Sequence, residues 1–172
     1  MVTVTESLGC TASFSNIQVT QPPAIQITAV NVQNVACYGQ ATGSITITSQ
    51  GGTGTIDYTI NPPANQTSTG FFTGLPAGNY VITATDDNGC SLQTTVSVTQ
   101  NPQIVTASLT LTEPICNGDA NGIINISATG GFPPIEYALD GPPFQNTGLF
   151  NAVLAGPHTI TFRDLLGCTK DT

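Results

Sequence analysis

The stretch Leu75–Cys90, LPAGNYVITATDDNGC, contains a turn, a strand with period-two alternation, and a second turn that ends in a cysteine. A related stretch, VLAGPHTITFRDLLGC, ends 78 residues later at Cys168, and VTVTESLGC ends 80 residues earlier at Cys10. Recurrence at a fixed period indicates that each copy is one structural unit of a tandem array. A repeat of roughly 80 residues is large enough to hold its own small core.

Apolar residues alternate with polar ones in several short segments around this stretch, and no segment has helical periodicity. Pairs such as Ile45 with Ile47 and Tyr58 with Ile60 would each share one face of a strand. Six or seven short strands in one repeat, separated by frequent turn signals, predict an all-β fold of tandem immunoglobulin or fibronectin-like β-sandwiches.

The motif L-x-x-G-x-Y, which ends at Tyr80, is typical of a tyrosine corner, in which the tyrosine hydroxyl bonds a backbone group slightly upstream. The second copy has His158 at this position. An imidazole can donate one hydrogen bond from a similar place, so we expect Tyr80 and His158 to be structural corner residues.

Proline-rich segments mark the expected domain boundaries. Residues 1–22 read as the last hairpin of a preceding, truncated repeat, residues 23–101 as a complete repeat, and residues 102–172 as a repeat that lacks its last strand. The linkers contain Pro22-Pro23 and Asn101-Pro102, which predicts short, semi-rigid connections. Because Met1 falls in the middle of a strand, we expect this chain to be a piece of something longer.

The composition disfavours several classes of partner. Only 7% of the 172 residues are charged, two are basic, and the net charge is −8. Neutralising phosphates requires clustered Lys and Arg, so the composition argues against nucleic acid and acidic membrane surfaces as partners. There is no apolar run near 18 residues and no signal-peptide pattern, so we expect no transmembrane segment here and an export signal outside this window.

Five cysteines fall into two classes, those that close a D-x-x-G-C turn and those that open a C-x-G-x-x-x-G segment. The separations of 53 residues from Cys37 to Cys90 and 52 from Cys116 to Cys168 predict one disulfide within each repeat, which leaves Cys10 unpaired. Disulfides would imply an oxidising compartment. In a regular sandwich the two turns lie at opposite ends, which would instead join Cys37 to Cys168 across the junction, and buried free thiols are a further alternative.

Candidate catalytic and metal-binding groups are sparse. A hydrolase of the Ser–His–acid kind would need His158 beside a nucleophile, but the other copy has Tyr80 at this position, so the trait would belong to a single repeat and we expect no enzyme. We favour no cofactor. The alternative is calcium at the domain junctions, bound by the carboxylates of Asp86, Asp87, Glu113 or Asp119. The sequence has no D-x-D-x-D-G calcium-binding motif, which argues against this alternative.

Four motifs together carry a family resemblance: C-x-G-x-x-x-G-x-I, G-G-x-x-x-I-x-Y, L-x-A-G-x-Y and D-x-x-G-C. They begin at Cys37 and Cys116, Gly51 and Gly130, Leu75, and Asp86 and Asp164, respectively. The chain resembles the SprB-type repeats of giant surface adhesins from gliding Bacteroidetes. It departs from that pattern at His158, at Glu6 in place of Asp, and by a one-residue deletion between Asp140 and Phe150.

The resemblance implies an extracellular, outer-membrane-associated location, export by the type IX route, and contact with the gliding and secretion machinery. Two functions then compete. In the first, the repeats are a stalk that spaces an adhesive tip from the cell and contact mainly neighbouring repeats. In the second, each repeat binds polysaccharide or another surface directly. No Trp is present and aromatic residues are only 6% of the chain, which favours the stalk.

Overall fold

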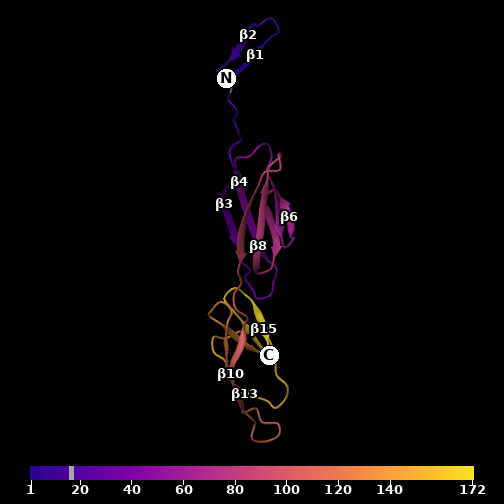
Figure 1. The fold of residues 1–172 in the computed structure, drawn as a ribbon. Coiled ribbons are helices and arrows are strands. Elements are labelled where there is room, and N and C mark those ends of the chain that lie inside the picture. Colours follow the sequence, from indigo (N-terminus) through magenta and orange to yellow (C-terminus); the bar gives the residue numbers. More distant parts are fainter. Residues whose placement is uncertain (16–17) are drawn as a thin grey trace.

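The computed structural model describes residues 1–15 and 18–172, and the secondary structure in these ranges consists of strands without helices. At the N-terminal end, β1 (Val2–Thr5) and β2 (Thr11–Phe14) pair as an isolated antiparallel hairpin whose side chains are all exposed. Residues 18–25 lead into the first of two larger units, which lie end to end (Figure 1).

The first unit is a sandwich of two antiparallel sheets. Its strands are β3 (Gln26–Gln33), β4 (Gly43–Gln50), β5 (Asp57–Asn61), β6 (Asn65–Ser68), β7 (Phe71–Leu75), β8 (Gly78–Thr85) and β9 (Ser91–Val98). One sheet has the order β3-β4-β7-β6 and the other β5-β8-β9. Lettered A to G along the chain, these sheets are ABED and CFG, the arrangement of an immunoglobulin constant-type domain. The predicted all-β, immunoglobulin-like fold is confirmed.

The second unit repeats this arrangement with one strand fewer among its described residues. Its strands are β10 (Val105–Thr112), β11 (Gly122–Thr129), β12 (Glu136–Leu139), β13 (Leu149–Val153), β14 (Ile160–Arg163) and β15 (Thr169–Asp171). The sheets have the orders β10-β11-β13 and β12-β14-β15. Where the first unit has β6, the chain bridges back from Gln145 to Tyr137. The one-residue deletion lies in this segment.

The last strand of the second unit corrects one expectation. The sequence led us to expect that this repeat lacks the strand equivalent to β9. The structure instead pairs the first three residues of that strand, as β15, with β14 through Thr161↔Asp171, Phe162↔Lys170 and Arg163↔Thr169. Three residues suffice because the turn before them is already closed by backbone hydrogen bonds.

Each unit has its own core, filled by the inward residues of alternating strands. Ile45, Phe72 and Ile82 of the first unit have no exposed surface, and Phe162 of the second is 1% exposed. The second core has an additional large aromatic: Phe162 of β14 stands where β8 has Ala84, while Phe150 keeps the position of Phe72 but is only partly buried. Phe162 there packs edge to face on Tyr137, with ring centroids 5.6 Å apart. Each repeat therefore buries an apolar core of its own, as its length predicts.

Candidate functional site at the junction of the two units

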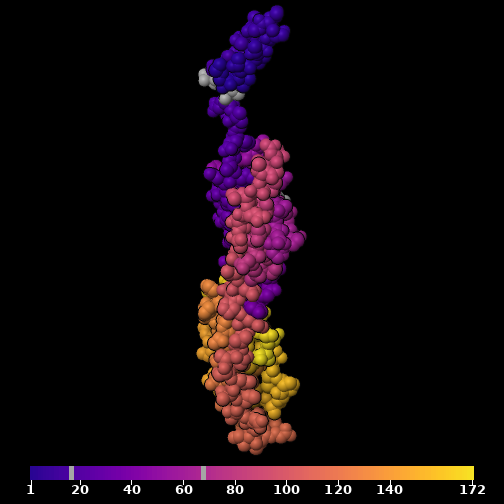
Figure 2. All heavy atoms as spheres, in the orientation of Figure 1, coloured from indigo at the N-terminus to yellow at the C-terminus, as the bar shows by residue number. Residues whose placement is uncertain are grey.

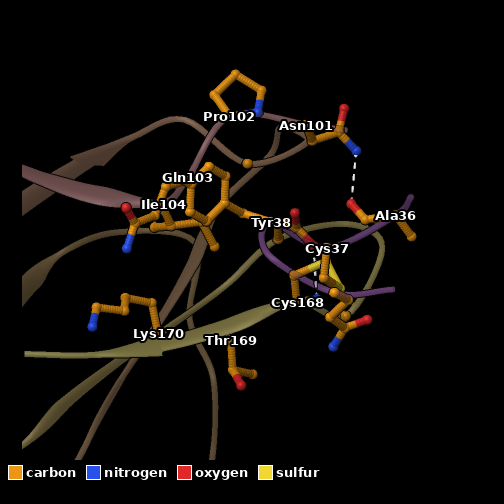
Figure 3. Close-up of a pocket in the computed structure, with 14 residues that line it drawn as sticks. Ala36, Cys37, Tyr38, Asn101, Pro102, Gln103, Ile104, Cys168, Thr169 and Lys170 are labelled. Atoms are coloured by element: carbon orange, nitrogen blue, oxygen red, sulfur yellow. Dashed lines mark hydrogen bonds between the residues drawn. A yellow bond between two sulfur atoms is a disulfide. The ribbon is translucent and has the colours of Figure 1, made fainter. Parts of the chain in front are cut away.

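The β3–β4 loop (residues 34–42) lies at the end of the first unit that faces the second. Backbone groups of Val35 and Thr99 share a hydrogen bond of 2.9 Å, and the Asn34 carboxamide oxygen accepts one from the Thr99 N–H, also at 2.9 Å. Asn101 donates to the Ala36 carbonyl at 2.9 Å (Figure 3). These bonds fix the loop against the start of the linker, so Cys37 is presented from a rigid support.

The β14–β15 turn (residues 164–168) lies at the facing end of the second unit. Asp164, only 3% exposed, organises it. One carboxylate oxygen accepts the N–H groups of Leu166 and Cys168 at 3.0 and 2.9 Å, and the other accepts the N–H of Phe132 at 2.9 Å. A buried carboxylate is stable when its oxygens are bonded in this way.

A disulfide joins the two units: Cys37 is bonded to Cys168, with their Cα atoms 5.4 Å apart and 131 residues apart in sequence. The predicted pairs Cys37–Cys90 and Cys116–Cys168 are therefore wrong. Equal spacing along the chain does not bring the two turns together, because they stand at opposite ends of one sandwich. The alternative across the junction is the one observed.

The remaining cysteines of the described residues, Cys10, Cys90 and Cys116, are free thiols and are exposed. Cys90 lies in the β8–β9 turn, at the position equivalent to Cys168, and Cys116 lies in the β10–β11 loop, at the position equivalent to Cys37. Each unit therefore carries one cysteine at either end.

A small pocket of about 230 Å³ lies beside the disulfide, lined by both units and by the linker. Tyr38 of the loop, Ile104 of the linker and Lys170 of β15 are among its lining residues (Figure 3). In the space-filling view the surfaces of the two units meet without a break at this level (Figure 2). The junction is thus a contact, and the linker is not the sole connection.

Each unit has a pair of consecutive glycines, Gly51-Gly52 and Gly130-Gly131, in a loop that is hydrogen-bonded to the linker preceding the unit; we call these the paired-glycine loops. The N–H of Gly131 donates to the Pro102 carbonyl at 2.9 Å, and that of Gly52 donates to the Pro23 carbonyl at 2.7 Å. Gly130 has φ +86°, and a Cβ there would collide with the Gln103 carbonyl oxygen. The same separation of 29 residues, from Pro23 to Gly52 and from Pro102 to Gly131, was the sequence signal that could have revealed this contact.

In the first unit, Asp86 is equivalent to Asp164 and makes the corresponding hydrogen bonds. Its carboxylate accepts the N–H groups of Thr53, Asn88 and Cys90 at 2.8–3.0 Å, and the last two of these lie within its own turn. Burial raises the pKa of Asp86, but these backbone hydrogen bonds together outweigh it and the pKa falls below its usual value. The turn is thereby joined to the paired-glycine loop.

The two corner residues make the bond expected of them. The Tyr80 hydroxyl donates to the Pro76 carbonyl at 2.7 Å, and burial raises the pKa of Tyr80. His158 places Nε2 2.9 Å from the Leu154 carbonyl oxygen, again four residues upstream. In both units the corner side chain therefore bonds the carbonyl four residues upstream, but the group that does so is a hydroxyl in the first unit and an imidazole in the second.

The partner of the other His158 nitrogen was not foreseen. Nδ1 lies 2.7 Å from the Asp140 carboxylate, whose second oxygen accepts the Thr159 N–H at 2.9 Å. Since a carbonyl and a carboxylate only accept, both ring nitrogens donate only when the imidazole is protonated. The hydrogen bond to Asp140, followed by that to Leu154, raises the pKa of His158, and the bond from His158 lowers the pKa of Asp140.

The carboxylates considered for calcium do not form a cluster. Asp86 and Asp87 lie in the β8–β9 turn of the first unit, whereas Glu113 and Asp119 lie in the β10–β11 loop of the second. Both Asp86 oxygens already accept backbone N–H groups. Within residues 1–15 and 18–172, no group of three His, Cys, Asp or Glu side chains is placed to hold a metal ion.

The described part of the chain also contains no helix long and apolar enough to span a membrane.

Comparison with known proteins gives two kinds of match. A C-terminal 282-residue fragment of intimin, solved with the intimin-binding domain of its translocated receptor, is 14% identical with a TM-score of 0.40, and extracellular domains 3–5 of Drosophila OTK are 16% identical with a TM-score of 0.35. Each alignment covers 86% of this chain, and the chain spans 62% and 59% of those proteins, respectively. No curated protein matches significantly.

The family match comes from the sequence model of the SprB repeat, which matches residues 29–65 and 108–144. The first segment runs from within β3 to the start of β6, and the second covers the equivalent part of the second unit. Cys37 and Cys116 lie inside the matches, while the corner residues lie outside. Two segments of this chain, one in each unit, are therefore SprB repeat matches, as the four sequence motifs predicted.

Proposed function

We propose that the chain is a structural stalk segment of a long, repetitive bacterial surface adhesin that takes part in surface attachment and gliding. The observation that carries this proposal is the Cys37–Cys168 bond. Because of this bond, the two units are joined by two covalent connections, which are the linker and the disulfide. A spacer requires such resistance to bending at its junctions, since stiff units joined by free hinges would collapse.

Noncovalent contacts at the linker support the same reading. The Pro102 carbonyl is bonded to the second unit and the Asn101 side chain to the first, so the linker is held on both sides. Asn101-Pro102 also restricts the backbone directly. These contacts remove the rotational freedom that an unanchored linker would have.

An extracellular or cell-surface location is supported by the SprB repeat matches and by a disulfide, a bond that persists in oxidising compartments. Outer-membrane association and contact with a gliding or secretion machinery belong to the proposal, and so does the absence of a cofactor. A structural role also agrees with the corner and turn residues, whose polar groups are occupied by backbone partners.

Small-angle scattering tests the stalk proposal. The full chain would be compared with a longer version in which residues 95–172 are appended after Thr172, which corresponds in the repeat to Thr94. We expect the maximum dimension to grow by one unit length, as for a rod. The Cys37→Ser variant should show a broader distance distribution, and Cys90→Ser should match the unaltered chain. Compact or freely jointed scaling in the oxidised chains would contradict the proposal.

The alternative, direct binding of polysaccharide, predicts specific signals on a glycan array. Asn65 and Gln66 are exposed polar residues of β6, an edge strand of the first unit, and are the residues to change in this test. Specific binding that is lost in Asn65→Ala and Gln66→Ala variants would replace the stalk with a binding module. Equal signals from the chain and both variants would favour the stalk.

A further inference from the structure

Each unit has one cysteine-bearing segment that is equivalent to one side of the junction but forms no disulfide here: the turn with Cys90 in the first unit and the loop with Cys116 in the second. In the β8–β9 turn, Asp86 N–H bonds the Cys90 carbonyl at 3.0 Å and Gly89 N–H bonds the Asp86 carbonyl at 2.9 Å. The same two bonds in the β14–β15 turn measure 3.0 Å each, between Asp164, Cys168 and Gly167. The two cysteine-bearing turns are therefore built alike, although only one holds a disulfide.

The loops at the other end of each unit are also alike. The N–H of Gln40 bonds the Cys37 carbonyl at 3.2 Å, and that of Asp119 bonds the Cys116 carbonyl at 3.1 Å. A glycine with positive φ follows the cysteine by two residues in both loops. Cys37, which is bonded to Cys168, is half-buried, whereas Cys116 is exposed.

The Cys37–Cys168 bond shows which partner such surfaces take. A loop cysteine of one unit meets the turn cysteine of the unit that follows it in sequence. We propose that Cys116 and Cys90 form the same bond with further SprB-type units. Cys116 pairs with the turn cysteine of a unit on its C-terminal side, and Cys90 pairs with the loop cysteine of a unit on its N-terminal side. Every junction of a tandem array is then closed by one disulfide.

The exposed Cys10 belongs to the same series. Its turn has the backbone bonds of the other two, from Glu6 N–H to the Cys10 carbonyl at 3.0 Å and from Gly9 N–H to the Glu6 carbonyl at 2.9 Å. Cys10 is therefore a turn cysteine, and the pairing rule excludes a bond between Cys10 and Cys90. Two turn cysteines occupy the same end of successive units.

The bond requires an oxidant. Two thiols lose two protons and two electrons as the S–S bond forms, and a small-molecule or protein disulfide accepts them and becomes two thiols. The inference rests on the tandem arrangement of the repeats and is independent of the stalk role.

The test uses the full chain with residues 95–172 appended, in which the second unit has a complete last strand and a third unit follows. Refolding in a glutathione redox buffer and peptide mapping without reduction identify the bonds. The appended copy carries Cys116→Ser, so that its turn cysteine has no loop cysteine in its own unit. We expect Cys37–Cys168, Cys116 bonded to the appended Cys168, and free Cys10 and Cys90.

The matched control moves the Cys116→Ser change to the middle unit and leaves the appended Cys116 intact. The appended Cys168 should then remain a free thiol. A bond between the appended Cys116 and the appended Cys168, a free Cys116 in the first version, or any bond to Cys90 would overturn the inference. The Cys37–Cys168 peptide reports that folding and oxidation have occurred, and its absence would also overturn the inference.

Discussion

At the residue scale, one buried carboxylate in each unit bonds two backbone segments through three N–H groups. Asp164 receives N–H groups from its own turn and from the paired-glycine loop, which in turn bonds the linker. The carboxylate thus positions the cysteine of the turn and the linker that enters the unit. Its function is structural even though an isolated Asp in a glycine-rich turn could resemble a binding residue.

Replacing this carboxylate should destabilise the second unit. Asp164→Ala leaves three N–H donors without their acceptor, and hydrogen bonds to charged groups are worth enough that we expect a loss of about 2–4 kcal/mol in the free energy of unfolding. Denaturant titration followed by circular dichroism measures it. The control is Asp87→Leu, which installs the residue type that the second unit has at Leu165. A loss no larger than that of the control would refute the role given to Asp164.

The histidine corner makes the second unit sensitive to pH. Because the pKa of His158 is raised above its ordinary 6.5, its contribution is fully present below pH 6.5 and is lost as pH rises through the folded-state value. The pKa of Asp140 is lowered from 3.8, so its contribution is present above that pH and is lost as pH falls through the lower folded-state value. The pair therefore stabilises the unit most between these limits.

The His158→Tyr variant should remove the alkaline part of this dependence. Its hydroxyl can bond the Leu154 carbonyl as Tyr80 bonds Pro76, without titrating near neutrality. Thermal unfolding from pH 5 to 9 compares the two chains, and NMR titration of the imidazole reports the pKa directly. An imidazole that titrates at or below 6.5, or an unchanged pH profile in the variant, would contradict this account. Asp140→Asn should return the His158 pKa toward its ordinary value.

At the scale of structural elements, the β3–β4 loop and the β14–β15 turn join two folding units into one. The loop closed by the disulfide spans 131 residues, for which the chain-entropy estimate gives a stabilisation of about 5 kcal/mol. Most of both cores lies within that closed loop. The disulfide therefore couples the stabilities of two units whose cores are separate.

Removing the bond should uncouple the units. In Cys37→Ser we expect unfolding at lower denaturant concentration, with separate transitions for the first and second units, because each core then melts on its own. Cys90→Ser is the control, since Cys90 is a free thiol here. Differential scanning calorimetry resolves the transitions. One unchanged, concerted transition in Cys37→Ser would show that the disulfide does not couple the units.

The elements were predictable because their signals are local. Alternation placed strands around Ile45, Tyr58 and Tyr80, and the repeat length predicted separate cores. The disulfide pairing was not predictable from spacing, since the distance between Cys37 and Cys90 depends on which end of the sandwich each turn occupies. The His158–Asp140 pair was missed for a similar reason: Asp140 directly follows β12 and His158 lies two residues before β14, and only the pairing of these two strands brings them together.

At the scale of the whole molecule, the disulfide changes the path that a pulling force follows. With Cys37 bonded to Cys168, tension between the chain ends passes through β3, the disulfide and β15, and bypasses the residues between the two cysteines. Those residues hold most of both sandwiches. In an array closed in this way at each junction, the load within each inner unit passes through the segment between its own two cysteines, residues 116–168 in the second unit, so the disulfides limit how far each unit can extend. A limited extension under load is a property that a surface stalk needs.

Force spectroscopy on the full chain, held at its two ends, measures this most directly. At about 3.5 Å per residue, the segments outside the closed loop, residues 1–36 and 169–172, can add at most about 140 Å of contour length in the oxidised chain. Adding a reductant should release about 450 Å more from the 131-residue loop. The Cys37→Ser chain should extend fully with or without reductant. Full extension of the oxidised, unaltered chain would contradict the central claim that the two units are covalently closed across their junction.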